Sequence, residues 1–286
     1  MTLTIITINY NNAVGLQKTM ESVLAQTSKD FEYIIIDGAS TDGSGDYLKT
    51  INYKLQTTNY KLVSEPDNGI YHAMNKGIRM AKGEYVHFLN SGDWLVDKHV
   101  VEKMLGELKE LITKEQQPDV FVGNKIMIRP DGKIRRGHND KRTVSAFTFY
   151  RGTIEHTSAY IRRELFNTVG LYDETFRIVS DWKWYFEAVL HHHARVAFTD
   201  LYVTYFDNTG ISSTNQQLDK AERRQVLEQM LPPAVLADYD TYSFDIDQMQ
   251  RLKRYSVLYR LVWFIERCLF KLDKWNMKYW GWRKMK

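Results

Sequence analysis

The sequence predicts an α/β protein built on a mainly parallel sheet, followed by a helical extension of different character. In the first half of the chain, short apolar runs alternate with amphipathic stretches, which is the rhythm of strand–helix–strand crossover units. Beyond Pro232-Pro233 the charge changes, and basic residues accumulate toward the C-terminus.

The first half reads as four strands, each followed by a helix. The strands are predicted over residues 3–8, 31–36, 60–64 and 84–89. Apolar residues at helical spacing predict helices over residues 15–26, around Leu48, over 70–81 and over about 98–113. This alternation favours crossovers between parallel strands.

The second half is less regular. Strands are predicted over residues 120–128, 133–137, 157–161 and 196–206, with a turn at 130–132. A helix is predicted over about 181–191, and further helices from about Gln216.

Composition narrows the class of protein. A chain of 286 residues that is 43% hydrophobic can bury a substantial core, and its one cysteine excludes an intramolecular disulfide. The first ten residues lack the basic flank of a secretion signal, and no uncharged apolar run approaches the roughly 20 residues of a spanning helix. We therefore expect a cytoplasmic protein that is soluble or peripheral on the inner face of the membrane.

Polar residues follow all four strands of the first half, at residues 9–12, Asp37, 65–68 and 90–93. Ligands of open parallel sheets bind beyond the carboxyl ends of the strands, so these residues predict a site. The sequence has no P-loop, no G-x-G-x-x-G after the first strand, no Cys/His metal cluster and no G-x-S-x-G elbow. These absences argue against P-loop kinases and dinucleotide dehydrogenases.

Five segments in order resemble the family 2 glycosyltransferases of the GT-A fold. They are residues 3–12 (LTIITINYNN), 34–44 (IIIDGASTDGS), 64–78 (SEPDNGIYHAMNKGI), 88–95 (FLNSGDWL) and 180–182 (SDW). The resemblance covers about residues 1–213, and Gly210 to Ser213 resembles the family segment that closes over the donor phosphates. It implies an inverting, metal-dependent transfer of a sugar from a nucleotide diphosphate donor, with UDP the expected nucleotide.

The resemblance also assigns roles to residues. The implied nucleotide-binding residues are Thr7, Asn9, Asn11, Asp37, Asp67, Asn90 and Ser91. Asp37 is expected to accept hydrogen bonds from the base, a charge-assisted contact, with a turn-capping role as the alternative.

Asp93 is the predicted ligand of Mn²⁺ or Mg²⁺, which would neutralise the leaving diphosphate. The segment Asn90-Ser91-Gly92-Asp93 departs from the family's run of aspartates, because Gly92 removes a carboxylate. The alternative for Asp93 is a strand-end turn.

Asp181 is the predicted catalytic base, with a helix cap formed by Ser180 or Asp181 as the alternative. One carboxylate suffices for direct displacement with inversion, whereas a retaining double displacement requires a second nucleophile. Three side chains are predicted to contact the acceptor or the donor sugar, with burial in the core as the alternative: Trp94, His156 and Trp182.

The tail has a charge pattern of its own. Residues 250–286 carry 11 Lys or Arg and 2 Asp or Glu, a net charge of +9, against −5 for the rest of the chain. From Tyr255 onward, helical spacing places one apolar stripe (Leu258, Leu261, Ile265, Leu269, Leu272) and one basic stripe (Arg260, Arg267, Lys271, Lys274, Lys278). This pattern favours binding at an anionic membrane surface, with packing on the body or on a second subunit as alternatives.

We assign residues 1–231 to the glycosyltransferase domain and residues 232–286 to the tail. Within the domain, residues 1–115 form the nucleotide-binding half and 116–231 the acceptor-binding half. The expected partners are a nucleotide-sugar and a saccharide or lipid-linked acceptor, and a homodimer stays open. Nucleic acid is disfavoured, because the basic residues share a helix with a large apolar face. A catalytically silent assembly subunit is the alternative function.

Overall fold

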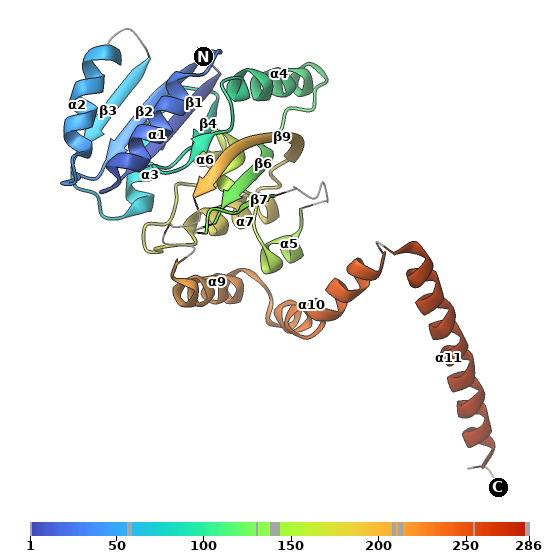
Figure 1. Cartoon of the computed structure of the whole chain (residues 1–286). Coiled ribbons are helices and arrows are strands. Elements are labelled where there is room, and N and C mark those ends of the chain that lie inside the picture. The colour runs from blue at the N-terminus through green and yellow to red at the C-terminus, as the bar shows by residue number, and fades with distance from the viewer. Residues whose placement is uncertain are drawn as a thin grey trace. The chain divides into compact units, whose positions relative to one another are not determined.

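The computed structural model describes residues 2–55, 59–129, 131–137, 144–207, 210, 214–253 and 255–283. The chain forms two compact units, Met1–Met230 and Leu231–Lys286. The first unit holds the sheet and its helices, and the second holds the helices α10 (Pro233–Lys253) and α11 (Ser256–Arg283) (Figure 1).

The described residues of the first unit alternate between strands and helices. The strands are β1 (Leu3–Asn9), β2 (Phe31–Asp37), β3 (Tyr60–Ser64), β4 (Tyr85–Phe88), β5 (Trp94–Leu95), β6 (Val120–Ile128), β7 (Ile134–Arg136), β8 (Ala159–Arg162) and β9 (Val196–Asp207). The helices are α1 (Ala13–Leu24), α2 (Ser44–Leu55), α3 (Ile70–Met80), α4 (Val100–Thr113), α5 (Ala146–Arg151), α6 (Leu165–Thr168), α7 (Ser180–Leu190) and α9 (Gln216–Met230), with a 3₁₀ turn η1 (His156–Ser158).

The strands join in one sheet in the order β3-β2-β1-β4-β8-β6-β9-β5, with β7 paired to β6. The four strands β1 to β4 are mutually parallel, as predicted. In the second half β6 and β9 are parallel, whereas β8 runs antiparallel to both β4 and β6. The predicted α/β class is confirmed, and antiparallel pairing enters in the second half.

Strand β1 lies in the middle of the parallel part and is buried along its whole length. Its residues Leu3 and Ile5 share a core cluster with Leu16 of α1 and Val101 of α4. Coverage on both faces explains why this strand has no alternation of buried and exposed residues.

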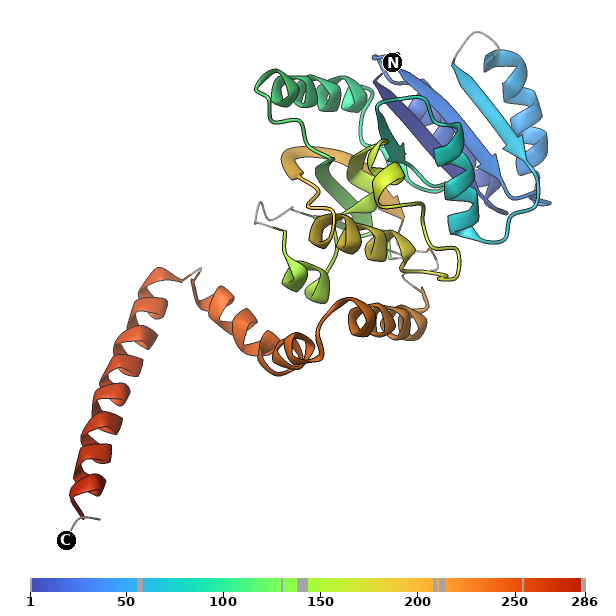
Figure 2. The same cartoon turned by 180° about the vertical axis from the view of Figure 1, so that it is seen from behind.

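The opposite face of the sheet carries α3, which approaches β1 through Gly77. A Cβ atom on Gly77 would lie 2.6 Å from Ile6 Cγ2, so the glycine permits the close contact. In Figure 1 α1 lies in front of the sheet, and in Figure 2 the teal helix α3 and the gold helix α7 do.

Three short elements were not predicted: β5, α5 and α6. They span two, six and four residues, which is too short for a periodic apolar pattern.

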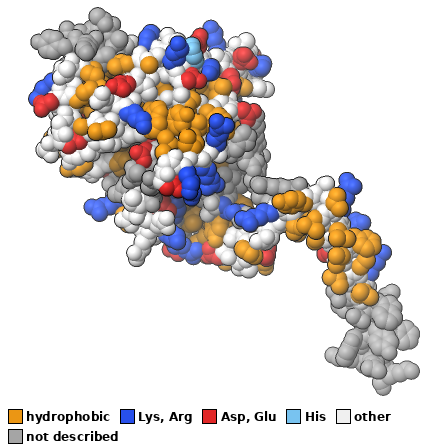
Figure 3. Space-filling model, viewed as in Figure 1, with side chains coloured by type: hydrophobic (Ala, Val, Ile, Leu, Met, Phe, Trp, Pro, Cys, Tyr) orange, Lys and Arg blue, Asp and Glu red, His pale blue; other side chains and the backbone are white. Residues whose placement is uncertain are grey.

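The second unit has an amphipathic surface. The predicted apolar stripe of α11 lies on one continuous helix, and its five side chains are 47–56% exposed. Figure 3 shows hydrophobic and basic side chains along the described part of this helix. Within the described residues, every helix is too short or too polar to span a bilayer.

Candidate active site

A pocket opens beyond the carboxyl ends of β1, β4 and β9. Its volume is about 690 Å³, which suits a nucleotide-sized ligand. The pocket is lined by Ile8, Asn9, Tyr10, Asn12, Gly38, Asp67, Gly69, Ile70, Ala73, Asn90, Ser91, Gly92, Asp93, Phe206, Asp207 and Gly210. Five predicted nucleotide or metal residues are therefore brought together: Asn9, Asp67, Asn90, Ser91 and Asp93.

Asp37 lies behind the pocket wall and is fully buried. Its Oδ1 accepts hydrogen bonds from Asn9 Nδ2 at 2.8 Å and Ser40 Oγ at 2.6 Å, and its Oδ2 accepts one from Ser64 Oγ at 2.7 Å. Burial alone raises the pKa of Asp37, but these hydrogen bonds outweigh it and hold the pKa below its usual value. The ionised carboxylate thus fixes Asn9, and a contact with a nucleobase stays a prediction.

Two predicted nucleotide contacts do not line the pocket. Thr7 is buried, and its hydroxyl donates to the Leu89 carbonyl at 2.7 Å, so its contact with a nucleotide stays a prediction. Asn11 is exposed, with φ at 48°, and its Oδ1 accepts from Thr41 N at 2.8 Å. Its loop neighbours Tyr10 and Asn12 do line the pocket, and Asn12 Oδ1 caps α1 by accepting from Gly15 N at 3.1 Å.

Asp93 lies 5% exposed at the edge of the pocket, and its Oδ1 accepts from Asp207 N at 3.0 Å. Burial raises the pKa of Asp93 to about 7. Asp207, at the end of β9, lines the same pocket. Asn90 Oδ1 is buried without a hydrogen-bond partner among the described residues. Three oxygen-bearing side chains therefore border one corner of the pocket.

Gly92 is required by the turn that carries Asp93. Its φ of +104° is a left-handed conformation that other residues rarely adopt. A Cβ atom at this position would also lie 3.3 Å from Asn12 Nδ2. The backbone conformation therefore explains why the family's additional carboxylate is absent here.

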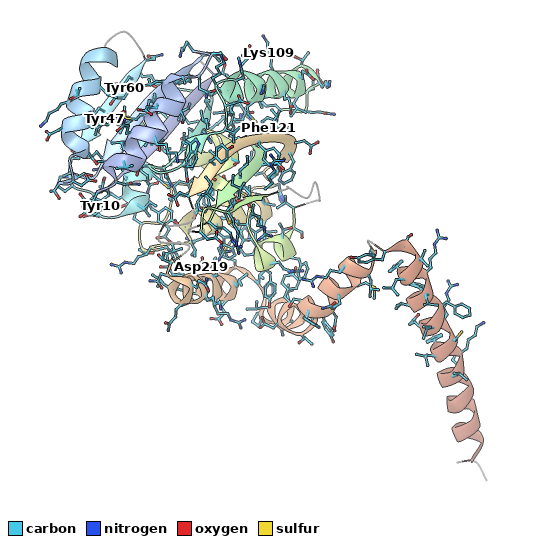
Figure 4. All side chains as sticks on the ribbon, viewed as in Figure 1. Tyr10, Tyr47, Tyr60, Lys109, Phe121 and Asp219 are labelled. Atoms are coloured by element: carbon cyan, nitrogen blue, oxygen red, sulfur yellow. The ribbon has the colours of Figure 1, made fainter. Side chains whose placement is uncertain are left out.

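Asp67 faces the pocket from the loop after β3. Its Oδ1 binds Lys76 Nζ at 2.7 Å and His72 Nδ1 at 3.0 Å. Its Oδ2 is buried and has no hydrogen-bond partner in the part of the chain that the structure describes. Across from it, Tyr10 is 70% exposed in the loop after β1 (Figure 4). This corner offers a carboxylate and an aromatic face.

Asp181 lies in the first turn of α7 and is partly exposed. Its Oδ1 accepts a hydrogen bond from Tyr71 OH at 2.9 Å. Tyr71 belongs to α3, whose residues Ile70 and Ala73 line the pocket, so Asp181 is one helix away from it.

The capping alternative for Asp181 does not match the geometry. The N-cap position of α7 is Val179, and no side chain of the helix caps it. Instead Glu222 of α9, only 8% exposed, accepts from the backbone N–H groups of Arg177, Ile178 and Val179 at 2.9–3.2 Å. A distant carboxylate therefore fixes the loop that leads into Asp181.

The predicted sugar contacts lie elsewhere. Trp182 is 1% exposed, and its Nε1 donates to the Gly152 carbonyl at 2.8 Å. His156 is 7% exposed, and its Nε2 lies 2.9 Å from Tyr172 OH. The core encloses both rings, and a contact of either ring with a sugar stays a prediction.

Trp94 is partly buried and does not line the pocket. Its ring stacks on Tyr205 with centroids 4.9 Å apart, and Lys18 Nζ lies 3.1 Å from the ring centroid. The aromatic residues that do line the pocket are Tyr10 and Phe206.

Four residues of the site were not predicted. Asp207 follows a predicted strand, so the rule of polar strand ends would have found it, and Tyr10 and Asn12 lie within the first quoted motif. Glu222 gives no local signal, because its role depends on contacts 43 to 45 residues away. Gly210 lines the pocket, while residues 211–213 of the expected closing segment lie outside the described residues.

Carboxylates and amides at the strand ends of an α/β sheet, around a nucleotide-sized pocket, define a nucleotide-binding class of protein. Residues 4–170 match the sequence profile of glycosyl transferase family 2, and the chain belongs to this family.

Two proteins from Mycobacterium tuberculosis are similar to this chain in sequence. A PGL/p-HBAD biosynthesis glycosyltransferase is 28% identical over 174 residues, which cover 60% of this chain and 63% of the relative. An uncharacterized glycosyltransferase is 30% identical over 213 residues, 74% of this chain and 77% of the relative. The first match thus spans less than two thirds of that relative's length.

Solved structures share the fold at low identity. S. aureus TarS 1-349 in complex with UDP-GlcNAc superposes with a TM-score of 0.61 at 16% identity, covering 88% of this chain and 79% of that one. The mannosyltransferase PcManGT from Pyrobaculum calidifontis, in complex with GDP-Man and Mn²⁺, gives 0.59 at 17% identity, with 79% and 63% covered.

Proposed function

We propose that the protein is an inverting glycosyltransferase that moves a hexosyl group from a nucleotide diphosphate sugar to a hydroxyl of a saccharide or lipid-linked saccharide. The observation that carries the proposal is the pocket at the strand ends, which joins Asp67, Asn90 and Asp93 around about 690 Å³. A UDP-sugar is the expected donor. Bound UDP-GlcNAc in TarS and GDP-Man in PcManGT support the donor class.

The corner formed by Asp93 and Asp207 fits Mn²⁺ or Mg²⁺. Both ions prefer oxygen ligands, and the partnerless Asn90 Oδ1 adds a third oxygen nearby. Within the described residues no group of three acidic, His or Cys side chains forms a metal cage. The diphosphate of the donor would therefore complete the coordination. A bound cation would supply charge neutralisation for the leaving group.

Asp181 is the proposed base. It takes the proton of the acceptor hydroxyl while that oxygen attacks the anomeric carbon and the nucleoside diphosphate departs with the bonding electrons. A single displacement inverts the anomeric configuration. Asn90 is proposed to bind the ribose of the donor. Asp67 and Tyr10 border the space proposed for the nucleobase.

The decisive test is release of nucleoside diphosphate from UDP-, GDP- and TDP-sugars with octyl glycosides as acceptors. Each donor is run with Mn²⁺ and with EDTA. Asp93→Asn and Asp181→Asn are each expected to reduce turnover at least 100-fold, in line with general-base and electrostatic contributions. Asp46→Asn, an exposed carboxylate on α2 with its side chain 85% accessible, is the matched control and should leave turnover unchanged.

A catalytically silent assembly subunit is the second candidate, and the loss of a carboxylate at Gly92 is the observation that favours it. Calorimetry with UDP-GlcNAc separates the two. Donor binding without turnover for any donor and acceptor would favour the silent subunit. Metal-dependent turnover that Asp181→Asn abolishes would exclude it.

We further propose that the tail binds an anionic membrane surface, which would hold the enzyme at the inner face of the membrane beside a lipid-linked acceptor. The apolar stripe of α11 is exposed, and the basic stripe lies on the same helix. Arg267 lies 5.2 Å from the Trp263 ring and Lys274 5.2 Å from the Phe270 ring, so aromatic and basic side chains adjoin. Each basic residue near such a surface contributes about 1 kcal/mol.

Cosedimentation of the full chain with vesicles tests this proposal. Vesicles with 30% phosphatidylglycerol should retain the protein, and pure phosphatidylcholine should not. Arg267→Gln with Lys271→Gln should weaken binding about 30-fold, as two lost charges predict. Lys49→Gln, an exposed lysine of α2, is the control. Binding that ignores lipid charge, or tail-dependent dimers without lipid binding, would contradict the membrane assignment.

A further inference from the structure

Tyr71 lies between the donor pocket and the proposed base. It is the second residue of α3, and its neighbours Ile70 and Ala73 line the pocket. Its own side chain is 4% exposed, and its ring packs on Tyr172 with centroids 5.8 Å apart. The same turn of α3 therefore carries side chains that line the pocket and the Tyr71 side chain, which is buried away from the pocket.

The Tyr71 hydroxyl has two acceptors within reach. It lies 2.9 Å from Asp181 Oδ1, and it also contacts the Ile178 carbonyl. Burial raises the pKa of Tyr71 well above its usual value, so the hydroxyl keeps its proton and stays a donor. The hydroxyl therefore links the Asp181 carboxylate to the backbone of the preceding loop and restricts the orientation of Oδ1.

We propose that Tyr71 is the positioning residue that holds the Asp181 carboxylate in the orientation needed for the base. This inference rests on the proposed function of Asp181. With Oδ1 held by Tyr71, Oδ2 is the oxygen that receives the proton of the acceptor hydroxyl. Tyr71 belongs to α3, the helix that also lines the donor pocket. The position of the base is therefore fixed relative to the donor as well as to the acceptor half.

Three other titratable groups act on Asp181, from η1, from the loop before α7 and from α7 itself. Burial lowers the pKa of His156, and burial raises the pKa values of Tyr172 and Tyr185 well above their usual value. Above neutral pH all three are therefore uncharged. Tyr71 is the one for which the structure gives a hydrogen bond to the Asp181 carboxylate.

The test is Tyr71→Phe, with Tyr185→Phe as the matched control. Tyr185 is also buried near Asp181, but its hydroxyl has no hydrogen-bond partner among the described residues. In Tyr71→Phe kcat should fall about 100-fold with the KM for the acceptor unchanged, because the carboxylate of the base is no longer held in one orientation. In Tyr185→Phe kcat should stay at the wild-type value. The Kd for UDP should be unchanged in both variants.

A second variant separates the hydroxyl from the fold. 3-Fluorotyrosine at position 71 keeps both the ring and the hydroxyl, so kcat should stay close to the wild-type value. If Tyr71→Phe does not fold, this variant together with Tyr185→Phe keeps the comparison.

The outcomes separate the two proposals. An unchanged kcat in Tyr71→Phe, or equal losses in Tyr71→Phe and Tyr185→Phe, overturns the role of Tyr71. Full turnover in Asp181→Asn overturns the proposed base, whatever Tyr71→Phe does. A loss of kcat in Tyr71→Phe but not in Tyr185→Phe, with Asp181→Asn inactive, supports both.

Discussion

The contact between Glu222 and the loop before α7 makes a quantitative prediction. The carboxylate of Glu222 accepts three backbone N–H groups, from Arg177 at 2.9 Å, Ile178 at 3.0 Å and Val179 at 3.2 Å. In Glu222→Gln an amide NH₂ replaces one oxygen and faces at least one of these donors. The variant therefore loses at least one hydrogen bond to a charged group and leaves a buried N–H without a partner.

The expected loss in the free energy of unfolding is about 1.5–3 kcal/mol, the usual value for such a bond. In a chain of this size that corresponds to a decrease of roughly 4–8 °C in Tm. Turnover should fall further than stability alone explains, because Asp181 follows the loop by two residues. A displacement of about 1 Å at a reacting group can cost about 100-fold in rate.

Urea denaturation at neutral pH and steady-state kinetics measure the two effects. Glu228→Gln on the same helix is the control. Glu228 is exposed and pairs with Arg224 at 2.7 Å, so its loss should change stability by no more than about 0.5 kcal/mol. If Glu222→Gln is as stable and as active as Glu228→Gln, the inferred role of the loop is wrong.

Three further predictions concern the body of the fold. His87 is buried, and burial lowers its pKa to about 4. Below about pH 6.5 the imidazole is protonated in the unfolded chain but stays neutral in the folded chain. The free energy of unfolding therefore decreases as the pH is lowered. Between pH 7 and pH 5 the wild type should lose about 2 kcal/mol more than His87→Phe in urea titrations, and equal losses would refute this. Gly77→Ala should destabilise by about 1–3 kcal/mol, because its Cβ would meet Ile6 Cγ2 at 2.6 Å, and an unchanged Tm would contradict that packing. Trp182→Phe removes the hydrogen bond to the Gly152 carbonyl and should lower stability by about 1–3 kcal/mol without raising KM for the acceptor. A raised KM at unchanged stability would restore Trp182 as a sugar contact.

The local pattern of residues was sufficient to predict the strands of the parallel half of the sheet. Residues 3–8 are all Leu, Ile or Thr, five of them β-branched, and this strand-forming run is visible without a structure. The short elements β5, α5 and α6 form through tertiary contacts and carry no periodic signal of their own.

The polar residues at the strand ends were also readable, because parallel strands bring their carboxyl ends to one edge of the sheet. Asn9, Asn90, Ser91 and Asp93 meet at the pocket for this reason. The burial of the aromatic residues could not be predicted, because a tryptophan beside a motif has the same local sequence whether its ring faces a ligand or the core. Only packing against Phe149, Phe186 and their neighbours decides that Trp182 is enclosed.

The sequence by itself therefore determined the order of strands and helices in the parallel half, the family, and the edge of the sheet at which the site lies. These properties depend on periodicity and on motifs, both of which are local. The tertiary structure decided which carboxylates face the pocket, bringing Asp207 beside Asp93 and turning Asp37 inward. It also decided that Tyr71 and Glu222 meet the segment around Asp181 from 110 and 43 to 45 residues away. Contacts between residues so far apart depend on how the helices pack, which no short segment of the chain encodes.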